Sequence, residues 1–201
     1  MLLAAGAGSR LGGRPKSLLE LDGTPLIRRM ITTLFDAGVE SVVMVLGHYA
    51  DAIENAVRDL PVTRVRNPSP ENGPASSLRL GLQALAKDVG AVIVALADQP
   101  LITPADINDL IAAFKSRGET HMVVPRVNGE PGNPIIVDSA LRDEWMAGDL
   151  CATGQRWRNA NPTRLHWFDT NNDHYRVDID TPEDLTRFRA RTGRTLRWSD
   201  L

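Results

Sequence analysis

Residues 1–23 read MLLAAGAGSRLGGRPKSLLELDG, and this opening stretch carries the prediction of the fold. A short apolar run leads into a loop with four glycines within eight positions: Gly6, Gly8, Gly12 and Gly13. In doubly wound α/β sheets, ligands bind beyond the carboxyl ends of the strands, where such a loop would lie. Because glycine lacks a Cβ atom, its backbone N–H can approach phosphate oxygens, and nearby basic side chains can add charge-assisted bonds. The stretch therefore predicts an anion-binding loop after the first strand.

The rest of the chain alternates short apolar runs with amphipathic segments, which predicts strand–helix–strand units. Continuous apolar runs such as AVIVA predict strands that are covered on both faces. A GEPG loop at 129–132 interrupts the alternation of strands and helices, and it predicts an antiparallel excursion, in which a strand runs against the direction of its neighbours. The expected strands are 2–5, 41–46, 62–66, 91–95, 121–125, 134–137 and 165–168, and the expected helices are 25–37, 50–60, 76–86, 104–117, 139–146, 153–159 and 182–192.

This pattern predicts one domain over residues 1–201, with a three-layer α/β/α Rossmann-like fold and a mostly parallel mixed sheet. Helix ends carry matching signals, since Thr103 and Thr181 are candidate N-caps before prolines. The first predicted strand starts at the initiator methionine, so we expect either a natural chain that begins a few residues earlier or a short first strand.

The composition is that of an ordinary globular protein, and the single cysteine suits a reducing cytoplasm. The 201 residues carry a formal net charge of −2, which gives no reason to expect nucleic acid or an anionic membrane as a partner. No apolar run approaches the length of about 20 residues that a membrane-spanning helix needs. Cys151 is the single cysteine, so neither an internal disulfide nor a CxxC zinc site is expected.

Two known phosphate-loop patterns fit the opening stretch poorly. The dinucleotide fingerprint GxGxxG has two residues between its second and third glycines, whereas three residues lie between Gly8 and Gly12. In addition, no acidic residue stands at the end of the second predicted strand. The P-loop pattern GxxxxGK[ST] fails because Gly13 is followed by Arg-Pro and the proline removes an N–H donor.

Carboxylates stand at two further loop entrances. Asp98 follows the most apolar predicted strand, where an acid is well placed to hold a hard cation over the cleft. Asp178 and Asp180 are separated by one residue and would share a face in an extended segment. Asp98 and Asp180 each have a simpler alternative role as the cap of the helix that follows.

The whole opening, LAAGAGSRLGGRPKSLLELDGTPLI, resembles the MobA-like NTP transferase family, whose members pass a nucleoside monophosphate from an NTP to a phosphorylated acceptor. The later segments NPSPENGPASSLRLGL, ADQP and DTPEDL resemble family motifs in family order. The resemblance implies that Asp98 and Asp180 bind Mg²⁺, with Asp178 a less secure neighbour, and that Arg10, Lys16 and Asp98 are catalytic. It also implies a nucleotide-binding set: Leu3, Ala4, Ala5, Gly6, Gly8, Ser9, Arg10, Lys16, Asn67, Gly73, Ser76 and Ser77.

Within this family the chain most resembles the molybdenum cofactor cytidylyltransferases. Ala5 in LAAG favours CTP over GTP as the donor. The Gly132-Asn133-Pro134 segment and ADQP favour molybdopterin as the acceptor, with Gln99 and Asn133 as acceptor contacts and a molybdenum hydroxylase as a client. Gly148-Asp149 matches the relatives' next motif, whereas the following LCATGQRW departs from it.

Two other functions remain open on the sequence. One is an NAD(P)-dependent oxidoreductase of the same superfamily, against which the missing ribose-binding acid argues. The other is a non-catalytic accessory protein that carries the cofactor, which the presence of Lys16, Asp98 and Asp180 disfavours.

Overall fold

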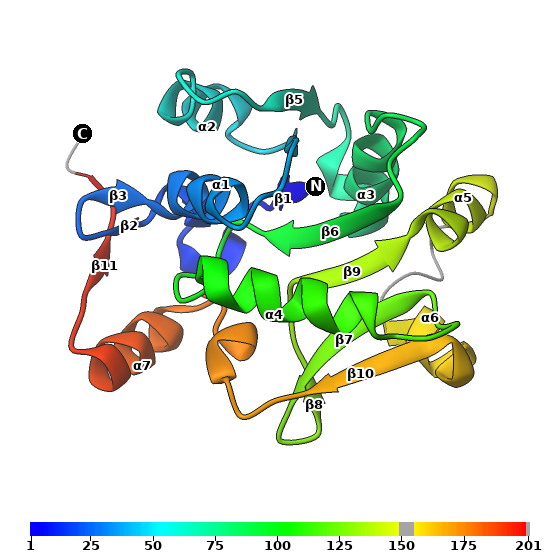
Figure 1. The fold of residues 1–201 in the computed structure, drawn as a ribbon. Coiled ribbons are helices and arrows are strands. Elements are labelled where there is room, and N and C mark those ends of the chain that lie inside the picture. Colours follow the sequence, from blue (N-terminus) through cyan, green and yellow to red (C-terminus); the bar gives the residue numbers. More distant parts are fainter. Residues whose placement is uncertain (149–154, 200–201) are drawn as a thin grey trace.

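The computed structural model describes residues 1–148 and 155–199, so Cys151 and Asp149 lie outside the described residues. An eight-stranded sheet crosses the molecule, and a three-stranded sheet lies at one end (Figure 1). The large sheet contains β1 (Leu2–Ala4), β4 (Val43–Leu46), β5 (Thr63–Arg66), β6 (Ala91–Leu96), β7 (Met122–Val127), β8 (Glu130–Pro131), β9 (Ile135–Asp138) and β10 (Leu165–Asp169). The small sheet contains β2 (Glu20–Leu21), β3 (Thr24–Pro25) and β11 (Leu196–Arg197).

The strand order of the large sheet is β10-β7-β9-β6-β1-β4-β5, and β8 pairs with β7. Strands β6, β1, β4 and β5 pair in parallel, as do β7 and β10, whereas β9 runs antiparallel to both β6 and β7. The predicted mostly parallel sheet with an antiparallel excursion is therefore confirmed. Because β1, β4 and β6 are parallel neighbours, the loops that follow them meet at one edge of the sheet.

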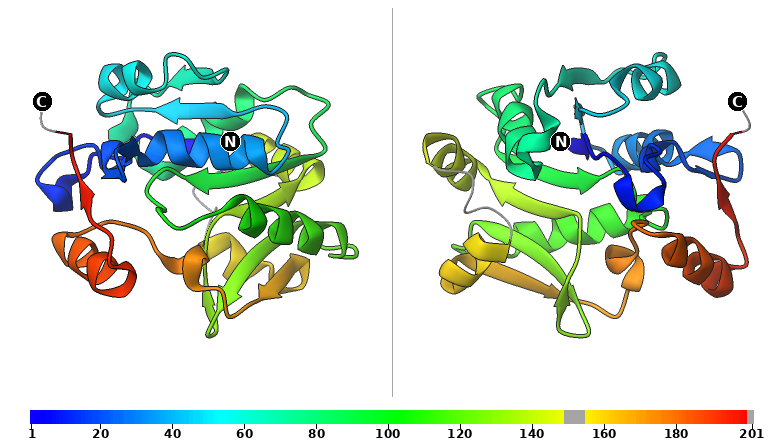
Figure 2. Two further views of the ribbon diagram at one scale, coloured as in Figure 1. Left: turned by 60° about the vertical axis from the view of Figure 1, so that its left-hand side comes forward. Right: turned by 180° about the vertical axis from the view of Figure 1, so that it is seen from behind.

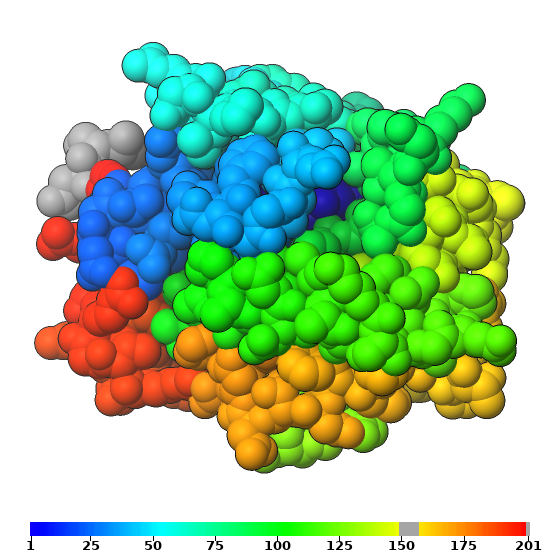
Figure 3. Space-filling view, in the orientation of Figure 1, coloured from blue at the N-terminus to red at the C-terminus, as the bar shows by residue number. Residues whose placement is uncertain are grey.

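Helices cover both faces of this sheet (Figures 1 and 2). One face carries α1 (Leu26–Asp36), α2 (Ala50–Ala56) and α4 (Pro104–Lys115), which share one core cluster with Leu2 and Met44. The other carries α3 (Pro74–Gln83), α5 (Ser139–Ala147) and α6 (Gln155–Ala160), which share a second cluster with Val45. Successive side chains of β4 thus point into opposite layers, as a strand's period of two requires. Figure 3 shows α4 lying across one face, above the C-terminal segment.

Most predicted boundaries agree with the structure to within a few residues, but some were wrong. Helix α2 ends at Ala56 rather than at residue 60, and α3 runs from Pro74 to Gln83 rather than over 76–86. Gly73 holds the N-cap position of α3 and Pro74 is its first helical residue, so Ser76 and Ser77 lie inside the helix. The four two-residue strands were not predicted, since pairs this short carry no periodic signal.

A third, smaller core joins the two ends of the chain. Helix α7 (Pro182–Thr192) and the small sheet lie together, on the left in Figure 1. Phe188 of α7 packs in one buried cluster with Leu19 and Leu21 from the opening stretch, Ile179 and Leu196. The C-terminal segment is thereby packed against the residues that flank the glycine loop.

Within the described residues, no helix is both long and apolar enough to cross a membrane.

We expect Phe188→Ala to lower the free energy of unfolding by about 3–5 kcal/mol, because it removes a buried ring and leaves a cavity in the third core. Urea denaturation followed by circular dichroism measures this change. Arg189→Ala on the exposed side of the same helix is the control and should stay within about 0.5 kcal/mol of the parent. Equal midpoints for the two variants would show that this core does not stabilise the fold.

Candidate active site

A cavity of about 540 Å³ opens where the carboxyl ends of β1, β4 and β6 meet. Its walls come from the glycine loop, from the residue pair after β4, from the loop into α3 and from the end of β6. The lining residues are Leu3, Ala4, Ala5, Gly6, Ala7, Lys16, Ser17, His48, Pro70, Glu71, Gly73, Pro74, Ser77, Leu96, Ala97 and Asp98. Such a cleft is large enough for a nucleotide-sized ligand.

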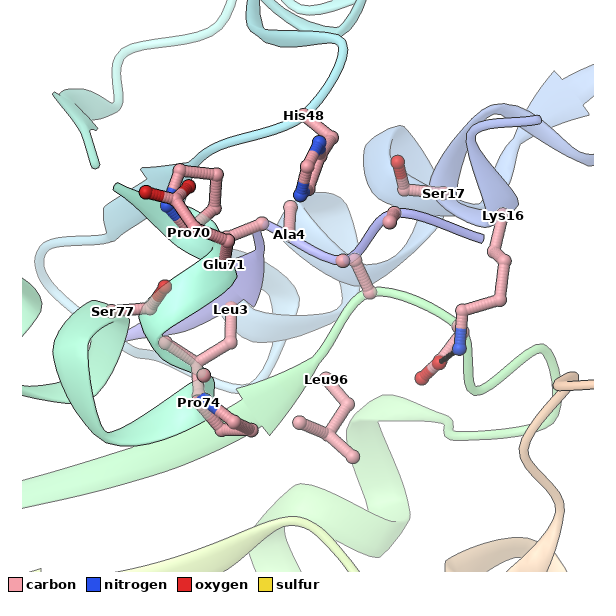
Figure 4. A pocket seen from close by; sticks show the side chains of 16 residues that line it. Leu3, Ala4, Lys16, Ser17, His48, Pro70, Glu71, Pro74, Ser77 and Leu96 are labelled. Atoms are coloured by element: carbon pink, nitrogen blue, oxygen red, sulfur yellow. Dashed lines mark hydrogen bonds and ion pairs between the residues drawn. The ribbon is translucent and has the colours of Figure 1, made fainter. Parts of the chain in front are cut away.

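The two ends of the cavity differ in chemistry. Figure 4 shows Leu3, Pro74 and Leu96 gathered at one end, with Glu71 and Ser77 nearby. Lys16 extends from the other end of the cavity. One end is therefore suited to a flat, largely apolar group, whereas the other is suited to charge.

The Lys16 ammonium lies between two carboxylates from distant parts of the chain. Its Nζ is 2.5 Å from Asp98 Oδ2 and 2.5 Å from Asp180 Oδ1. Burial alone would lower the pKa of Lys16, but the charge of Asp98 and the hydrogen bonds to both carboxylates outweigh burial and raise that pKa above its usual value. Asp98 and Asp180, which the resemblance assigns to Mg²⁺, thus both contact the same side-chain cation.

Backbone contacts bring Asp180 to this position. The N–H of Ile179 donates to the carbonyl of Asp98 at 3.1 Å, which ties the late segment directly to the loop after β6. Thr181 caps α7 in a capping box with Asp184, so Asp180 is not needed as a cap and its side chain is available to Lys16. Thr103 caps α4 in the same way, which frees Asp98. The capping alternatives for both acids are therefore wrong.

Two more charged groups border the pair. Arg10 contacts Asp180 at 3.3 Å, and its side chain is 70% exposed. Desolvation by the surrounding protein and the negative charges of Asp98 and Asp180 raise the pKa of Asp178. Asp178 therefore lies near these two carboxylates, although the residue is exposed to solvent. Asp178 is thus an electrostatic neighbour of the pair.

The glycine loop is shaped by its backbone. Gly8 has a φ of 59°, and its carbonyl accepts from the N–H groups of Leu11 and Gly13. A Cβ on residue 8 would lie 2.0 Å from the carbonyl oxygen of Arg14, so the loop folds back on itself too closely for any side chain there. Gly12 has a φ of 72° but faces open space.

Two aromatic residues support this loop from outside, and no local pattern in the sequence indicates either of them. The Tyr49 hydroxyl contacts the carbonyl oxygens of Gly13 and Ala7. The Trp198 indole N–H donates to the carbonyl of Pro15 at 3.2 Å, and the Arg14 guanidinium lies 4.1 Å from the Trp198 ring centroid. The residues that directly precede Lys16 are therefore held in place.

Asn67 lies behind the cavity wall and is hydrogen-bonded to residues of that wall. It is buried, and its Nδ2 donates to the hydroxyls of Ser76 at 2.8 Å and Ser77 at 2.9 Å. Its Oδ1 accepts from the backbone of Ser69. Ser77 lines the cavity, whereas Ser76 turns back to the carbonyl of Gly73. The predicted polar set thus forms one network of which Ser77 and Gly73 face the cavity.

Gln99 and Asn133, the predicted acceptor contacts, are joined directly. The Gln99 side chain is 5% exposed, and its Nε2 donates to the carbonyls of Asn133 at 3.0 Å and Tyr175 at 3.3 Å. Its Oε1 is buried and has no hydrogen-bond partner among the described residues. Gln99 therefore links the loop after β6 to the loop before β9.

The donor set at the Lys16 end suits a hard divalent cation. Asp98 Oδ1 is buried without a partner among the described residues, so one carboxylate oxygen is unsatisfied beside the pair. In the part of the chain that the structure describes, no cluster of three or more His, Cys, Asp or Glu side chains gathers closely enough to hold a metal ion. Mg²⁺ sites commonly use one or two carboxylates and complete the shell with phosphate oxygens and water. Asp98 and Asp180 fit that arrangement.

The predicted site residues fall into four groups in the structure. Those lining the cavity are Leu3, Ala4, Ala5, Gly6, Lys16, Gly73, Ser77 and Asp98. A second group contacts a lining residue through a hydrogen bond or ion pair, or shapes the loop: Gly8, Asn67, Ser76 and Asp180. Ser9 and Arg10 are exposed on the loop. Gln99 and Asn133 lie beyond Asp98.

Sequence analysis missed several lining residues. Pro70, Glu71 and Pro74 flank the predicted Gly73, Leu96 ends the strand before Asp98, and His48 follows β4. Their positions in the sequence could have identified these residues, because each lies next to the carboxyl end of a predicted parallel strand or on the loop into α3.

Comparisons with known proteins agree with this geometry. The model of the family described as MobA-like NTP transferase domain matches residues 1–164. Nicotine blue oxidoreductase of Paenarthrobacter nicotinovorans is 31% identical over 195 residues, which cover 93% of this chain and 94% of that protein.

Solved structures share the fold over nearly the whole chain. Rv0371c from Mycobacterium tuberculosis H37Rv is 25% identical with a TM-score of 0.76 and covers 93% of this chain and 94% of that chain. Rv0371c has also been solved in complex with manganese. A nucleotidyl transferase from Methanothermobacter is 25% identical with a TM-score of 0.72 and covers 94% of each chain.

We expect Gly8→Ala to be about 1–3 kcal/mol more destabilising than Gly12→Ala, because only the first adds a clash with backbone to the cost of a left-handed conformation. Thermal unfolding of the two variants measures the difference, and calorimetric titration with inorganic tripolyphosphate tests the loop itself. Gly12→Ala is the matched control. Equal stability and equal binding in the two variants would contradict the close approach of residues 8 and 14.

Proposed function

The chain belongs to the MobA-like NTP transferase family, and on this premise we propose that it transfers a nucleoside monophosphate from an NTP to a phosphorylated small molecule. CTP is the favoured donor, molybdopterin the favoured acceptor, and pyrophosphate the leaving product. Members of this family act on nucleoside triphosphates and small-molecule acceptors. The observation that carries the proposal is the Lys16 ammonium between Asp98 and Asp180 at the charged end of the cavity.

The proposed reaction needs no protein nucleophile. A terminal phosphate oxygen of the acceptor forms a bond to the α-phosphorus of the NTP, and the bond from that phosphorus to the oxygen bridging to the β-phosphate breaks. Negative charge then accumulates on the departing pyrophosphate. The protein's task is in-line positioning and neutralisation of that charge.

The residues at the charged end are suited to that task. The backbone of the glycine loop can place N–H groups close to phosphate oxygens because Gly6 and Gly8 carry no side chains. Lys16 and the exposed Arg10 supply positive charge for the β- and γ-phosphates. Asp98 and Asp180 would hold Mg²⁺, which supplies polarisation of the phosphoryl group and neutralises its charge.

The apolar end supports a base-binding role. Leu3, Pro74 and Leu96 offer flat contact area, and the Glu71 carboxylate lines the same end. A carboxylate accepts hydrogen bonds from an exocyclic amino group, which cytosine carries and uracil lacks. Ala5, the residue by which the chain resembles cytidine-specific relatives, also lines the cavity.

The acceptor is proposed from the resemblance and from one contact. Gln99 binds the carbonyl of Asn133, so the two residues proposed to contact molybdopterin lie together next to Asp98. A molybdenum hydroxylase would receive the product.

An oxidoreductase is the second candidate, because nicotine blue oxidoreductase matches this chain over nearly its whole length. The residues after β4 are Gly47, His48 and Tyr49, so the acid that would bind an NAD ribose is missing at that position. Fluorescence titration with NADPH separates the candidates. Saturable NADPH binding that CTP does not displace would favour the reductase.

The proposed activity is tested by incubating the protein with molybdopterin, Mg²⁺ and each of CTP, GTP, ATP and UTP. We expect pyrophosphate release with CTP, dependent on the acceptor, and less release with the other three. A coupled pyrophosphatase assay measures it, and mass spectrometry identifies the dinucleotide product. No release with any NTP in the presence of acceptor would reject the transferase proposal.

We expect Asp98→Ala to lower the rate of pyrophosphate release by about a hundredfold or more, on the order of 3 kcal/mol in the transition state. The fold should persist, because the backbone carbonyl of Asp98, not its side chain, binds Ile179. Asp109→Ala, an exposed acid on α4, is the matched control and should keep full activity. Mg²⁺-dependent turnover that survives in Asp98→Ala would refute the metal assignment.

A further inference from the structure

Lys16 occupies the place that a divalent ion would take between Asp98 and Asp180. The two nearest carboxylate oxygens are no more than 5.0 Å apart, since each lies 2.5 Å from the same nitrogen. An ion ligated by both oxygens would sit about 2.1 Å from each, within a few tenths of an ångström of the ammonium's own distance of 2.5 Å from each. The two cations cannot share that position.

Solvent does not relieve this competition. The Lys16 side chain is 18% exposed and that of Asp98 is 16% exposed, so water screens the charges only partly. A divalent ion on the free Oδ1 of Asp98 would still lie close to a positive charge. Lys16 must therefore leave before the pair can take an ion.

The Lys16 side chain can leave the two carboxylates without a movement of its backbone. Its backbone is held, because Trp198 binds the adjacent Pro15 carbonyl and the Leu19 N–H donates to the Lys16 carbonyl at 3.0 Å. Its long side chain, however, lines the cavity as well as contacting the acids. A rotation of the side chain alone would turn the ammonium toward phosphates bound on the glycine loop.

We propose that Lys16 holds the ion site closed in the nucleotide-free protein and that the nucleotide's phosphates open it. The triphosphate draws the ammonium away, and Asp98, Asp180 and phosphate oxygens then ligate the ion together. This inference rests on the proposed transferase function. It adds that ion and nucleotide bind with positive coupling, each raising the affinity for the other by the same factor.

The test measures Mn²⁺ binding in the absence of nucleotide. The electron paramagnetic resonance signal of free Mn²⁺ reports how much of the ion remains unbound. We expect weak binding by the parent protein and binding at least about tenfold tighter by Lys16→Met, in the usual range of such couplings. Lys115→Met, which removes an exposed lysine on α4, is the matched control for net charge and should behave like the parent. The double variant Lys16→Met/Asp98→Ala should lose the gain.

Equal Mn²⁺ affinity in the parent and Lys16→Met would overturn the inference, as would a gain that persists in the double variant. Circular dichroism checks folding, and Lys16→Gln, which keeps a polar but uncharged and shorter side chain, replaces Lys16→Met if that variant unfolds. The outcome is independent of turnover. Absence of pyrophosphate release in the parent would reject the transferase proposal and leave this binding comparison intact.

Discussion

The ion pairs of Lys16 with Asp98 and Asp180 are the interaction on which the site depends. They join the opening loop, the end of the most apolar strand and the segment before the last helix, which are separated by up to 164 positions in the chain. Three contacts make this possible: the Ile179–Asp98 backbone hydrogen bond, the small core around Phe188, and the braces from Tyr49 and Trp198. The backbone on either side of the charged groups is thus held by contacts that do not involve the ion pairs themselves.

The cavity combines two kinds of wall on one rigid edge of the sheet. Parallel pairing of β1 with β4 and β6, and of β4 with β5, places four loops at this edge. The glycine loop contributes backbone amides, the loop after β4 contributes His48, the loop into α3 contributes small polar side chains, and the loop after β6 contributes a carboxylate. The same fold supports different reactions among relatives, since one similar protein is named a nucleotidyl transferase and another an oxidoreductase. Function therefore follows from the site residues rather than from the sheet.

Particular residues show how far sequence analysis reaches. Asp98 was located because an acid after a buried strand stands at the ligand-binding edge, and Gly8 because glycines mark close backbone approach. Asn67, by contrast, was assigned to nucleotide binding from a motif, and the structure shows it buried behind Ser77 and bonded to it. Tyr49 and Trp198 were missed because nothing local distinguishes an aromatic residue that braces a loop from one that fills a core.

By itself the sequence determined the alternation of strands and helices, the glycine loop and the capped helix starts, because these depend on neighbours a few residues apart. The mostly parallel character of the sheet also followed, since repeated strand–helix–strand units imply right-handed crossovers between parallel strands. Only the tertiary structure decided that Lys16 lies between the two acids and that residues 179–198 pack against the opening loop. Such contacts join positions far apart in the chain, and their geometry is set by the packing of the whole core, which no local pattern encodes.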